Sequence, residues 1–187
     1  MNKQWLQCVF AAVLAAAGMA QAQEKYPVKP IRMIIGYAPG GGSDIMGRLI
    51  APQITEALGQ QVIVENRAGQ AQNIAAEFIV RQPSDGYTLF LSSAALGVNA
   101  TLYPKLNYDP VKDFIPVAVF ASSANLLLTH PSVPAKSVKE FIAVVKKNPG
   151  KMNYSSSGSG STQHLSGEML KLFIKGDFTH IPYKGTG

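Results

Sequence analysis

Cysteine is nearly absent from this sequence: the 187 residues include one, Cys8, close to the first residue. From residue 9 onward the chain therefore has no disulfide framework and no thiolate ligand for a structural zinc site. Charged residues are also scarce, at 15%, and the basic ones are scattered, with Lys146-Lys147 as their longest run. Such a distribution argues against a nucleic-acid partner. The 47% of hydrophobic residues predicts a globular fold held together by its core.

Motifs of the common enzyme classes are missing as well. The chain has no Gly-x4-Gly-Lys-Ser/Thr phosphate-binding run and no Gly-x-Ser-x-Gly window of the hydrolase type. Gly158-Ser159-Gly160 is followed by Gln163 where a dinucleotide fingerprint has its third glycine. The histidines His130, His164 and His180 share no metal-ligand spacing. We therefore predict no catalytic residue, no metal and no cofactor.

The first 22 residues are typical of a secretory signal peptide. Lys3 supplies a positive start, an apolar stretch runs from about residue 8 to residue 17, and Ala20-Gln21-Ala22 provides a small-x-small cleavage site. A membrane-spanning helix needs roughly 20 unbroken apolar residues, which is more than this stretch has. We expect export and cleavage after Ala22. Removing Lys3 lowers the net charge from +6 to +5, and a mildly positive chain suits a small anionic ligand.

The first half of the chain alternates strands and helices. Apolar, β-branched runs predict buried strands at residues 31–36, 62–66 and 87–92. Between them, Ser43 is expected to cap a long helix, and a shorter helix is expected at residues 74–81. The apolar stripe of the long helix consists of Ile45, Met46, Leu49, Ile50, Ile54, Ala57 and Leu58. This alternation predicts a parallel sheet, so the fold class is α/β.

The second half begins with a loop-rich stretch at residues 94–116, followed by apolar pieces at 117–121 and 126–129 that we expect to be strands. Ser137-Val138-Lys139-Glu140 is a capping box and predicts a helix after it. The remaining expected elements are a strand at 153–155, a helix with Leu165, Met169, Leu172 and Phe173 facing inward, and a strand at 178–182. The chain then stops in a glycine-rich turn where another helix normally follows, so we expect it to be a fragment.

Two strand–loop–helix junctions share one design, namely Gly40-Gly41-Gly42-Ser43-Asp44 and Ser157-Gly158-Ser159-Gly160-Ser161-Thr162. Glycine lets backbone N–H groups approach a ligand, and a helix N-terminus offers unpaired donors and a partial positive charge. Each loop alone is better explained as a structural turn, and Asp44 as a partner of its own helix dipole. Ligands of open α/β sheets bind at the carboxyl ends of strands, so the pair together favours a clamp for a small carboxylate.

At these residues the chain resembles the tripartite tricarboxylate transporter solute-binding proteins, also called Bug-type receptors. The resemblance covers residues 26–187 and depends on the order and spacing of many short motifs. These motifs are Tyr26-Pro27-x-Lys29-Pro30-Ile31-Arg32, Ala38-Pro39-Gly40-Gly41-Gly42-Ser43-Asp44, Val64-Glu65-Asn66-Arg67, Asp85-Gly86-Tyr87-Thr88-Leu89, Leu102-Tyr103-Pro104-Lys105-Leu106, Tyr108-Asp109-Pro110, Pro134-Ala135-Lys136-Ser137-Val138, Asn153-Tyr154, Gly160-Ser161-Thr162 and His180-Ile181-Pro182-Tyr183-Lys184-Gly185.

The resemblance implies a type II periplasmic-binding-protein-like fold with two lobes, each with a mainly parallel sheet: lobe one at residues 23–122 and an incomplete lobe two at 123–187. It implies a monomeric periplasmic receptor that uses no cofactor, closes about a hinge near residues 121–126, and delivers a small carboxylate to a two-component membrane permease. The matching ligand-binding residues are Gly41, Gly42, Ser43 and Asp44 in lobe one, Ser157, Gly160, Ser161 and Thr162 in lobe two, and Ser92, Ser93 and Ala94 on the cleft floor.

Two other interpretations stay open. The receptor could report its ligand to a membrane sensor instead of feeding transport, or the chain could be a secreted enzyme with Ser159 or Ser161 as nucleophile and His164 as base. Residues 68–72 depart from the glycine-rich loop usual in the family, so we expect no close backbone approach there. Family members continue well beyond residue 187, so we expect the isolated chain to be poorly stable, with unpaired strand edges.

Overall fold

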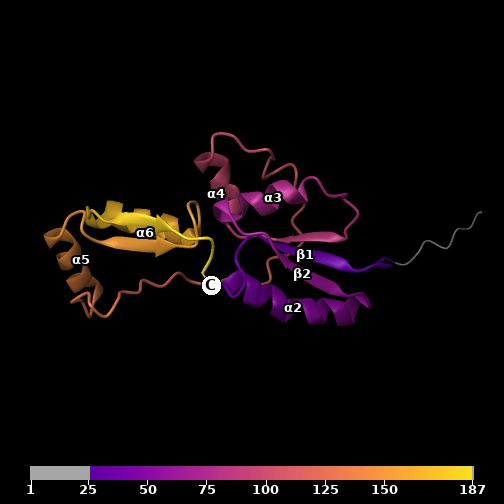
Figure 1. Cartoon of the computed structure of the whole chain (residues 1–187), viewed down its shortest axis with the longest axis horizontal. Coiled ribbons are helices and arrows are strands. Elements are labelled where there is room, and N and C mark those ends of the chain that lie inside the picture. The colour runs from indigo at the N-terminus through magenta and orange to yellow at the C-terminus, as the bar shows by residue number, and fades with distance from the viewer. Residues whose placement is uncertain (1–25, 187) are drawn as a thin grey trace, which may run out of the picture.

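The computed structural model describes residues 26–186, and the expected signal peptide at residues 1–22 lies outside them. The first part of the described chain forms β1 (Ile31–Ile35), α2 (Gly42–Leu58), β2 (Val62–Asn66), the short helical turn η1 (Gln70–Gln72), α3 (Asn73–Ile79), β3 (Thr88–Leu91) and α4 (Ala95–Leu102). The second part forms α5 (Val138–Lys147), β4 (Asn153–Ser156), α6 (Thr162–Ile174) and β5 (Thr179–Pro182). Figure 1 shows these two parts side by side along the long axis of the molecule.

Both sheets are parallel, as the alternation of strands and helices predicts. The first has the order β2-β1-β3, with Ile31 opposite Val62 and Arg32 opposite Thr88. The second pairs β4 with β5, starting with Asn153 opposite Thr179. The α/β fold with two lobes is thereby confirmed, while the lobe boundary at residue 122 and the hinge near residues 121–126 stay predictions.

Lobe one is built around a core of Ile31, Met33, Ala51 and Val62. Helix α2 turns its smallest side chains to the sheet, because a Cβ added to Gly47 would lie 2.6 Å from Ile35 Cδ1. The predicted apolar stripe of α2 is therefore wrong in part. Ile50 and Ile54 pack on the core, whereas Ile45, Leu49 and Leu58 are exposed.

Lobe two has a smaller core of Phe141, Val145, Ile174 and Phe178. The capping box that opens α5 is confirmed. Ser137 Oγ accepts a hydrogen bond from the backbone N–H of Glu140 (3.2 Å), and the Glu140 carboxylate accepts one from the backbone N–H of Lys136 (2.7 Å). This cap sets the start of α5 so that Phe141 and Val145 face the core.

The predicted inward face of α6 is wrong: Leu165, Met169, Leu172 and Phe173 are exposed, the last two at 78% and 79%. The helix instead turns Leu170 and Ile174 to the lobe-two core, and Gly167 lies against the ring of Tyr154. Because Gly167 has no side chain, α6 can approach Tyr154 of the sheet closely on this side, and this side therefore faces the sheet. The more apolar side therefore points to solvent.

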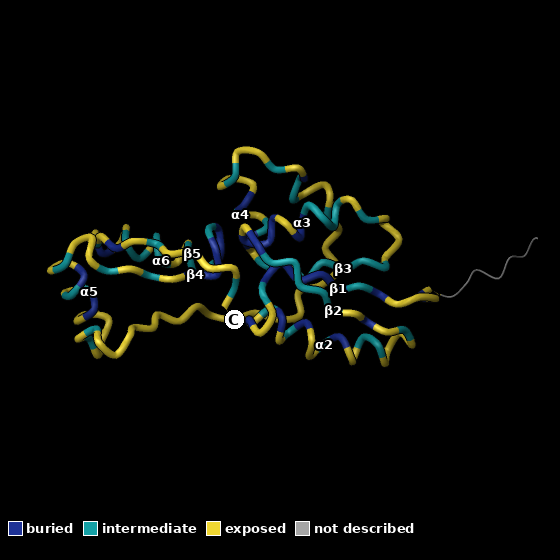
Figure 2. The backbone as a smooth tube through the Cα atoms, in the orientation of Figure 1, coloured by how far each residue is buried: buried dark blue, intermediate teal, exposed yellow. Residues whose placement is uncertain are grey.

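The two strands predicted at residues 117–121 and 126–129 are also wrong. Residues 114–137 form no helix or strand, and Val119 and Leu128 are 92% and 83% exposed. Figure 2 shows this segment as an exposed trace that leads to α5. Extended chain becomes a strand only beside a hydrogen-bonding neighbour, and no strand lies beside this segment within residues 26–186.

Helix α4 lies in the stretch that was expected to be loop-rich. Its residues Ala95 and Asn99 are buried against lobe one. Across the described part of the chain, no helix is both long enough and apolar enough to cross a membrane.

Candidate functional site

The first glycine loop joins β1 to α2. The helix begins at Gly42 with Gly41 as its N-cap, so the prediction of Ser43 as the cap is wrong. The Asp44 carboxylate reaches back instead and accepts a hydrogen bond from the backbone N–H of Gly40 (3.0 Å). The loop is therefore held by a carboxylate that belongs to the first turn of α2. A Ser43 cap would instead have been the residue directly before the helix.

Asp44 is buried and ionised. Its oxygens accept a hydrogen bond from Arg48 Nε at 3.0 Å, which lowers the pKa of the carboxyl to about 2. Arg48 also donates to Asn66 Oδ1 (3.0 Å), and Asn66 Nδ2 donates to the Tyr37 carbonyl (3.0 Å). The Asp44 side chain is thus engaged in holding the loop to the ends of β1 and β2. In the first turn of α2 the Gly42 N–H donates to Thr186 Oγ1, and helix geometry gives the N–H groups of Ser43 and Asp44 no partner within the helix.

The second glycine loop joins β4 to α6. Here a serine is the cap: Ser161 Oγ accepts a hydrogen bond from the backbone N–H of His164 (3.2 Å). Gly158 and Gly160 have φ values of +134° and +97°, which side chains rarely adopt. Ser157 Oγ donates to Gln163 Oε1 (2.8 Å), so this hydroxyl faces the first turn of the helix.

Three aromatic rings support the second loop. His164 and His180 stack with their ring centroids 4.1 Å apart, and Tyr154 stacks on His180 at 4.9 Å. His180 Nε2 lies 2.6 Å from Ser156 Oγ. Burial, followed by repulsion from His164, lowers the pKa of His180. His164 and His180 lie 16 residues apart, one on a helix and one on a strand, and no local sequence pattern relates two such positions.

The segment Tyr183–Thr186 contacts both glycine loops. In lobe two, the Tyr183 N–H donates to the carbonyl of Ser156, directly before the loop (2.9 Å), and a Cβ added to Gly158 would lie 3.2 Å from the Tyr183 carbonyl oxygen. In lobe one, the Gly42 N–H donates to Thr186 Oγ1, and the Ala38 N–H to the Lys184 carbonyl, both at 3.2 Å. Figure 1 shows this end of the chain between the two lobes, beside the start of α2. The loops therefore lie on opposite sides of one short segment.

The loop at residues 68–72 is close to lobe two, so the expectation of no close approach there is wrong. Gln70, Ala71 and Gln72 all have positive φ, and this left-handed turn brings Ala71 against the second glycine loop. A Cβ added to Gly158 would lie 3.4 Å from the Ala71 nitrogen. The Ala71 Cβ also faces this loop, because a Cβ added to Gly160 would lie 3.8 Å from it.

Helix α4 contributes a second contact between the lobes. A Cβ on Gly160 would lie 2.6 Å from Asn99 Oδ1, a buried oxygen without a hydrogen-bond partner among the described residues. Next to the helix, the Tyr103 hydroxyl donates to the Ser159 carbonyl (3.2 Å). Through these contacts the second glycine loop packs against lobe one.

Ser92, Ser93 and Ala94 follow β3 at the carboxyl end of the lobe-one sheet. Ser93 Oγ lies 2.8 Å from the Tyr37 hydroxyl, and the Ser93 N–H donates to Gln72 Oε1 (3.2 Å). Gln72 Nε2 returns a hydrogen bond to the Ser93 carbonyl (3.1 Å). The structure therefore ties this stretch to the left-handed turn, and Ala94 leads directly into α4.

The arrangement around His164 does not match the hydrolase alternative. His164 Nδ1 accepts a hydrogen bond from the Gly160 N–H (3.1 Å), and Ser161 Oγ is occupied as the helix cap. No hydrogen bond within residues 26–186 joins this imidazole to the hydroxyl of Ser159 or Ser161. Nor do those residues contain a cluster of three or more His, Cys, Asp or Glu that would hold a metal ion.

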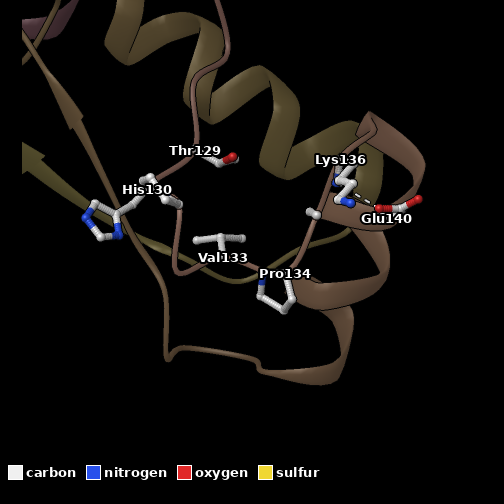
Figure 3. Close-up of a pocket in the computed structure, with 8 residues that line it drawn as sticks. Thr129, His130, Val133, Pro134, Lys136 and Glu140 are labelled. Carbon is white, nitrogen blue, oxygen red and sulfur yellow. Dashed lines mark hydrogen bonds between the residues drawn. The ribbon is translucent and has the colours of Figure 1, made fainter.

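A hollow in lobe two is lined by the segment at residues 129–136 and by Glu140 at the start of α5 (Figure 3). Of its polar groups, the Glu140 carboxylate is used by the Lys136 N–H as part of the helix cap. Its lining contains neither glycine loop. We therefore place the candidate site at the loops and not at this hollow.

Two parallel sheets in two lobes, with glycine loops at the carboxyl ends of their strands, form the fold of a periplasmic binding protein. The chain belongs to the tripartite tricarboxylate transporter receptor family: the family model described as "Tripartite tricarboxylate transporter family receptor" matches residues 46–187.

Individual relatives agree with this assignment. Protein BugT of Bordetella pertussis is 36% identical over 191 residues, which cover 100% of this chain and 59% of BugT. A Rhodopseudomonas palustris protein solved with adipate has a TM-score of 0.83 at 36% identity, over 86% of this chain and 54% of that one. MatC from the same organism, solved with bound malate, has a TM-score of 0.77 at 32% identity, over 86% and 55%. The chain thus spans about half the length of the relatives it matches.

Proposed function

We propose that the whole protein is a periplasmic receptor that captures a small carboxylate between its two lobes without chemical turnover. The observation that carries this proposal is the position of both glycine loops against the single segment Tyr183–Thr186. Each loop leads into a helix N-terminus, where unpaired N–H groups and the helix dipole attract an anion. Relatives solved with adipate and with malate support a carboxylate as the ligand class.

The proposed ligand-binding residues come from three places. The loops contribute Gly41, Gly42, Ser43, Asp44, Ser157, Gly160, Ser161 and Thr162, and the end of β3 contributes Ser92, Ser93 and Ala94. Asp44 supports its loop and leaves the backbone N–H groups to the anion, because both of its oxygens already accept hydrogen bonds.

The test is a thermal-shift screen of the whole receptor against mono-, di- and tricarboxylates. Ligand at a hundred times its dissociation constant adds about 2.7 kcal/mol to the free energy of unfolding, which is a readable shift. Gly42→Val is the informative variant, since a Cβ at Gly42 meets nothing within 4 Å and the fold tolerates it. Gly97→Val in α4 is the matched control, because its Cβ also meets nothing within 4 Å.

We expect Gly42→Val to lose the ligand-induced shift and Gly97→Val to keep it. A folded receptor that no carboxylate shifts would contradict the proposed ligand class. Unchanged ligand in the mixture, followed by NMR, would agree with binding without turnover.

We further propose that the receptor delivers its ligand to a two-component membrane permease. A strain that lacks the receptor gene should lose uptake of the carboxylate identified in the screen. The wild-type gene should restore uptake and Gly42→Val should not. Uptake that is unaffected by the deletion would favour the alternative in which the receptor reports its ligand to a membrane sensor.

A further inference from the structure

Two stacked histidines hold the second glycine loop by its backbone. The Gly160 N–H donates to His164 Nδ1 (3.1 Å). The Gly158 N–H donates to Ser156 Oγ (3.1 Å), and that oxygen lies 2.6 Å from His180 Nε2. Both glycine N–H groups are thus connected to an imidazole, directly in one case and through a hydroxyl in the other.

The hydrogen bond from Gly160 requires a neutral His164. Nδ1 accepts it only while that nitrogen carries a lone pair, so the proton of the ring lies on Nε2. Protonation places a second N–H opposite that of Gly160, and the hydrogen bond is lost. Gly160 directly precedes Ser161, the cap of α6, so displacement of its N–H also displaces the helix N-terminus.

Charged and titratable groups surround the pair on three elements. Glu168, one turn after His164 in α6, accepts hydrogen bonds from the Tyr154 hydroxyl of β4 (2.7 Å) and from Lys171 Nζ (3.3 Å). The Tyr154 hydroxyl also lies 3.3 Å from the His164 carbonyl. Glu168 and Lys171 carry opposite charges and form an ion pair at 3.3 Å. His180, stacked at 4.1 Å, disfavours a second charge once one ring is protonated.

Lobe one faces the same loop through neutral groups. The Tyr103 hydroxyl donates to the Ser159 carbonyl (3.2 Å), and Asn99 Oδ1 lies against Gly160. Neither group carries a charge, and neither forms a hydrogen bond with His164. The response to protonation is therefore movement of the loop.

We propose that His164, stacked on His180, positions the second glycine loop and makes carboxylate binding weaken as the pH falls through the range in which histidine titrates. This inference rests on the proposed function, and it names a positioning role that is separate from direct contact with the ligand.

The test compares four forms of the whole receptor at about pH 8 and about pH 5.5, on either side of histidine titration. Calorimetry with malate and with adipate measures affinity for wild type, His164→Asn, His164→Leu and His130→Asn. Asparagine keeps an oxygen that accepts the Gly160 N–H but takes up no proton. His130 is the matched control, because its Nδ1 also accepts a backbone N–H, from Ser132 (3.2 Å), at an exposed position outside both loops.

We expect wild type and His130→Asn to lose about tenfold more affinity on acidification than His164→Asn, the equivalent of one hydrogen bond. His164→Leu should bind weakly at both pH values. The carboxyl groups of the ligand titrate identically for every variant, so differences between variants report the protein alone. An equal loss in wild type and His164→Asn would overturn the proposal.

A second readout needs no ligand. The NMR chemical shift of the Gly160 amide in the ligand-free receptor should follow the titration of the His164 ring, and a shift that stays constant would overturn the proposal. If this amide titrates while neither malate nor adipate binds at pH 8, these ligands are wrong and the positioning role of His164 stands.

Discussion

The side-chain hydroxyl of Thr186 accepts a hydrogen bond from the backbone N–H of Gly42 at 3.2 Å, although 144 residues separate the two. The contact depends on the glycine that precedes it, since a Cβ on Gly41 would lie 2.9 Å from Thr186 Oγ1. Thr186 thus takes up one of the N–H groups that α2 would otherwise leave without a partner. It links the first glycine loop to the segment that also contacts the second loop.

Thr186→Val tests this link, because valine has the shape of threonine without the oxygen. We expect the free energy of unfolding to fall by about 1 kcal/mol, the usual net contribution of one hydrogen bond. Urea unfolding of the whole receptor measures the change. Thr179→Val, at an exposed position of β5, is the control. If Thr186→Val lowers the free energy of unfolding no more than Thr179→Val does, the hydrogen bond from Gly42 to Thr186 does not stabilise the fold.

Asp44 predicts a dependence of stability on pH. Its pKa in the folded protein is about 2, below the ordinary value of 3.8, mainly because Arg48 donates a hydrogen bond to it. A carboxyl with a lowered pKa contributes stability that is complete above about pH 4 and is lost as the pH falls through about 2. Because Arg48 is half-exposed, solvent screening reduces this contribution to about 1 kcal/mol.

Asp44→Asn keeps an oxygen for the Gly40 N–H but removes the ion pair. We expect it to be less stable than wild type at neutral pH and to match wild type near pH 2, as measured by urea unfolding at a series of pH values. Asp177→Asn, at an exposed position, serves as the control. If the free energies of unfolding of wild type and Asp44→Asn differ by the same amount from pH 7 to pH 2, the lowered pKa of Asp44 is contradicted.

Gly160→Ala separates backbone strain from contact between the lobes. Gly160 and Gly150 both have positive φ, +97° and +69°, so alanine strains the backbone at either position. At Gly160 the new Cβ would also meet Asn99 Oδ1 at 2.6 Å, whereas at Gly150 it meets Asp177 Oδ2 at 3.2 Å. We expect both variants to lose about 1 kcal/mol of stability. The affinity for a carboxylate should fall in Gly160→Ala and not in Gly150→Ala. Equal affinities of the two variants would show that the close approach of Asn99 to Gly160 does not matter for binding.

The exposed apolar face of α6 predicts which substitutions the chain tolerates. Leu172 and Phe173 are 78% and 79% exposed, so replacing both with glutamine should change the free energy of unfolding by less than about 0.5 kcal/mol. Light scattering of the chain from residue 23 onward should show less aggregation. Leu170→Gln is the control and should destabilise the fold, because Leu170 packs on the core. Equal destabilisation by both changes would place Leu172 and Phe173 in a packed interface.

Strands and loops of lobe one could be predicted because their signals are local. The apolar run at Ile31–Ile35 and the glycines after it determine a buried strand and a turn, whatever lies nearby. The capping box at Ser137 is local for the same reason. Helix α4 was missed because its apolar residues have no helical periodicity and its burial depends on contacts with the turn at residues 70–72.

The orientation of α6 could not be predicted, because its apolar stripe and its sheet-facing side differ. An apolar stripe predicts the buried side only when the neighbouring surface is known, and here the approach of Gly167 to Tyr154 decides it. The candidate site shows the same division. Its two loops can be predicted from short motifs. The roles of Ala71, Thr186 and the stacked histidines could not be predicted, because they depend on contacts between residues far apart in sequence.

The contact of Tyr183–Thr186 with both loops joins parts of the chain that are synthesised at different times. A chain emerges from its N-terminus, so the sheet of β1, β2 and β3 is available to fold while α6 is still untranslated. Until residue 186 has emerged, the Gly42 N–H lacks its Thr186 partner. The hydrogen bond between Gly42 and Thr186 therefore forms only after the residues of both cores have been synthesised.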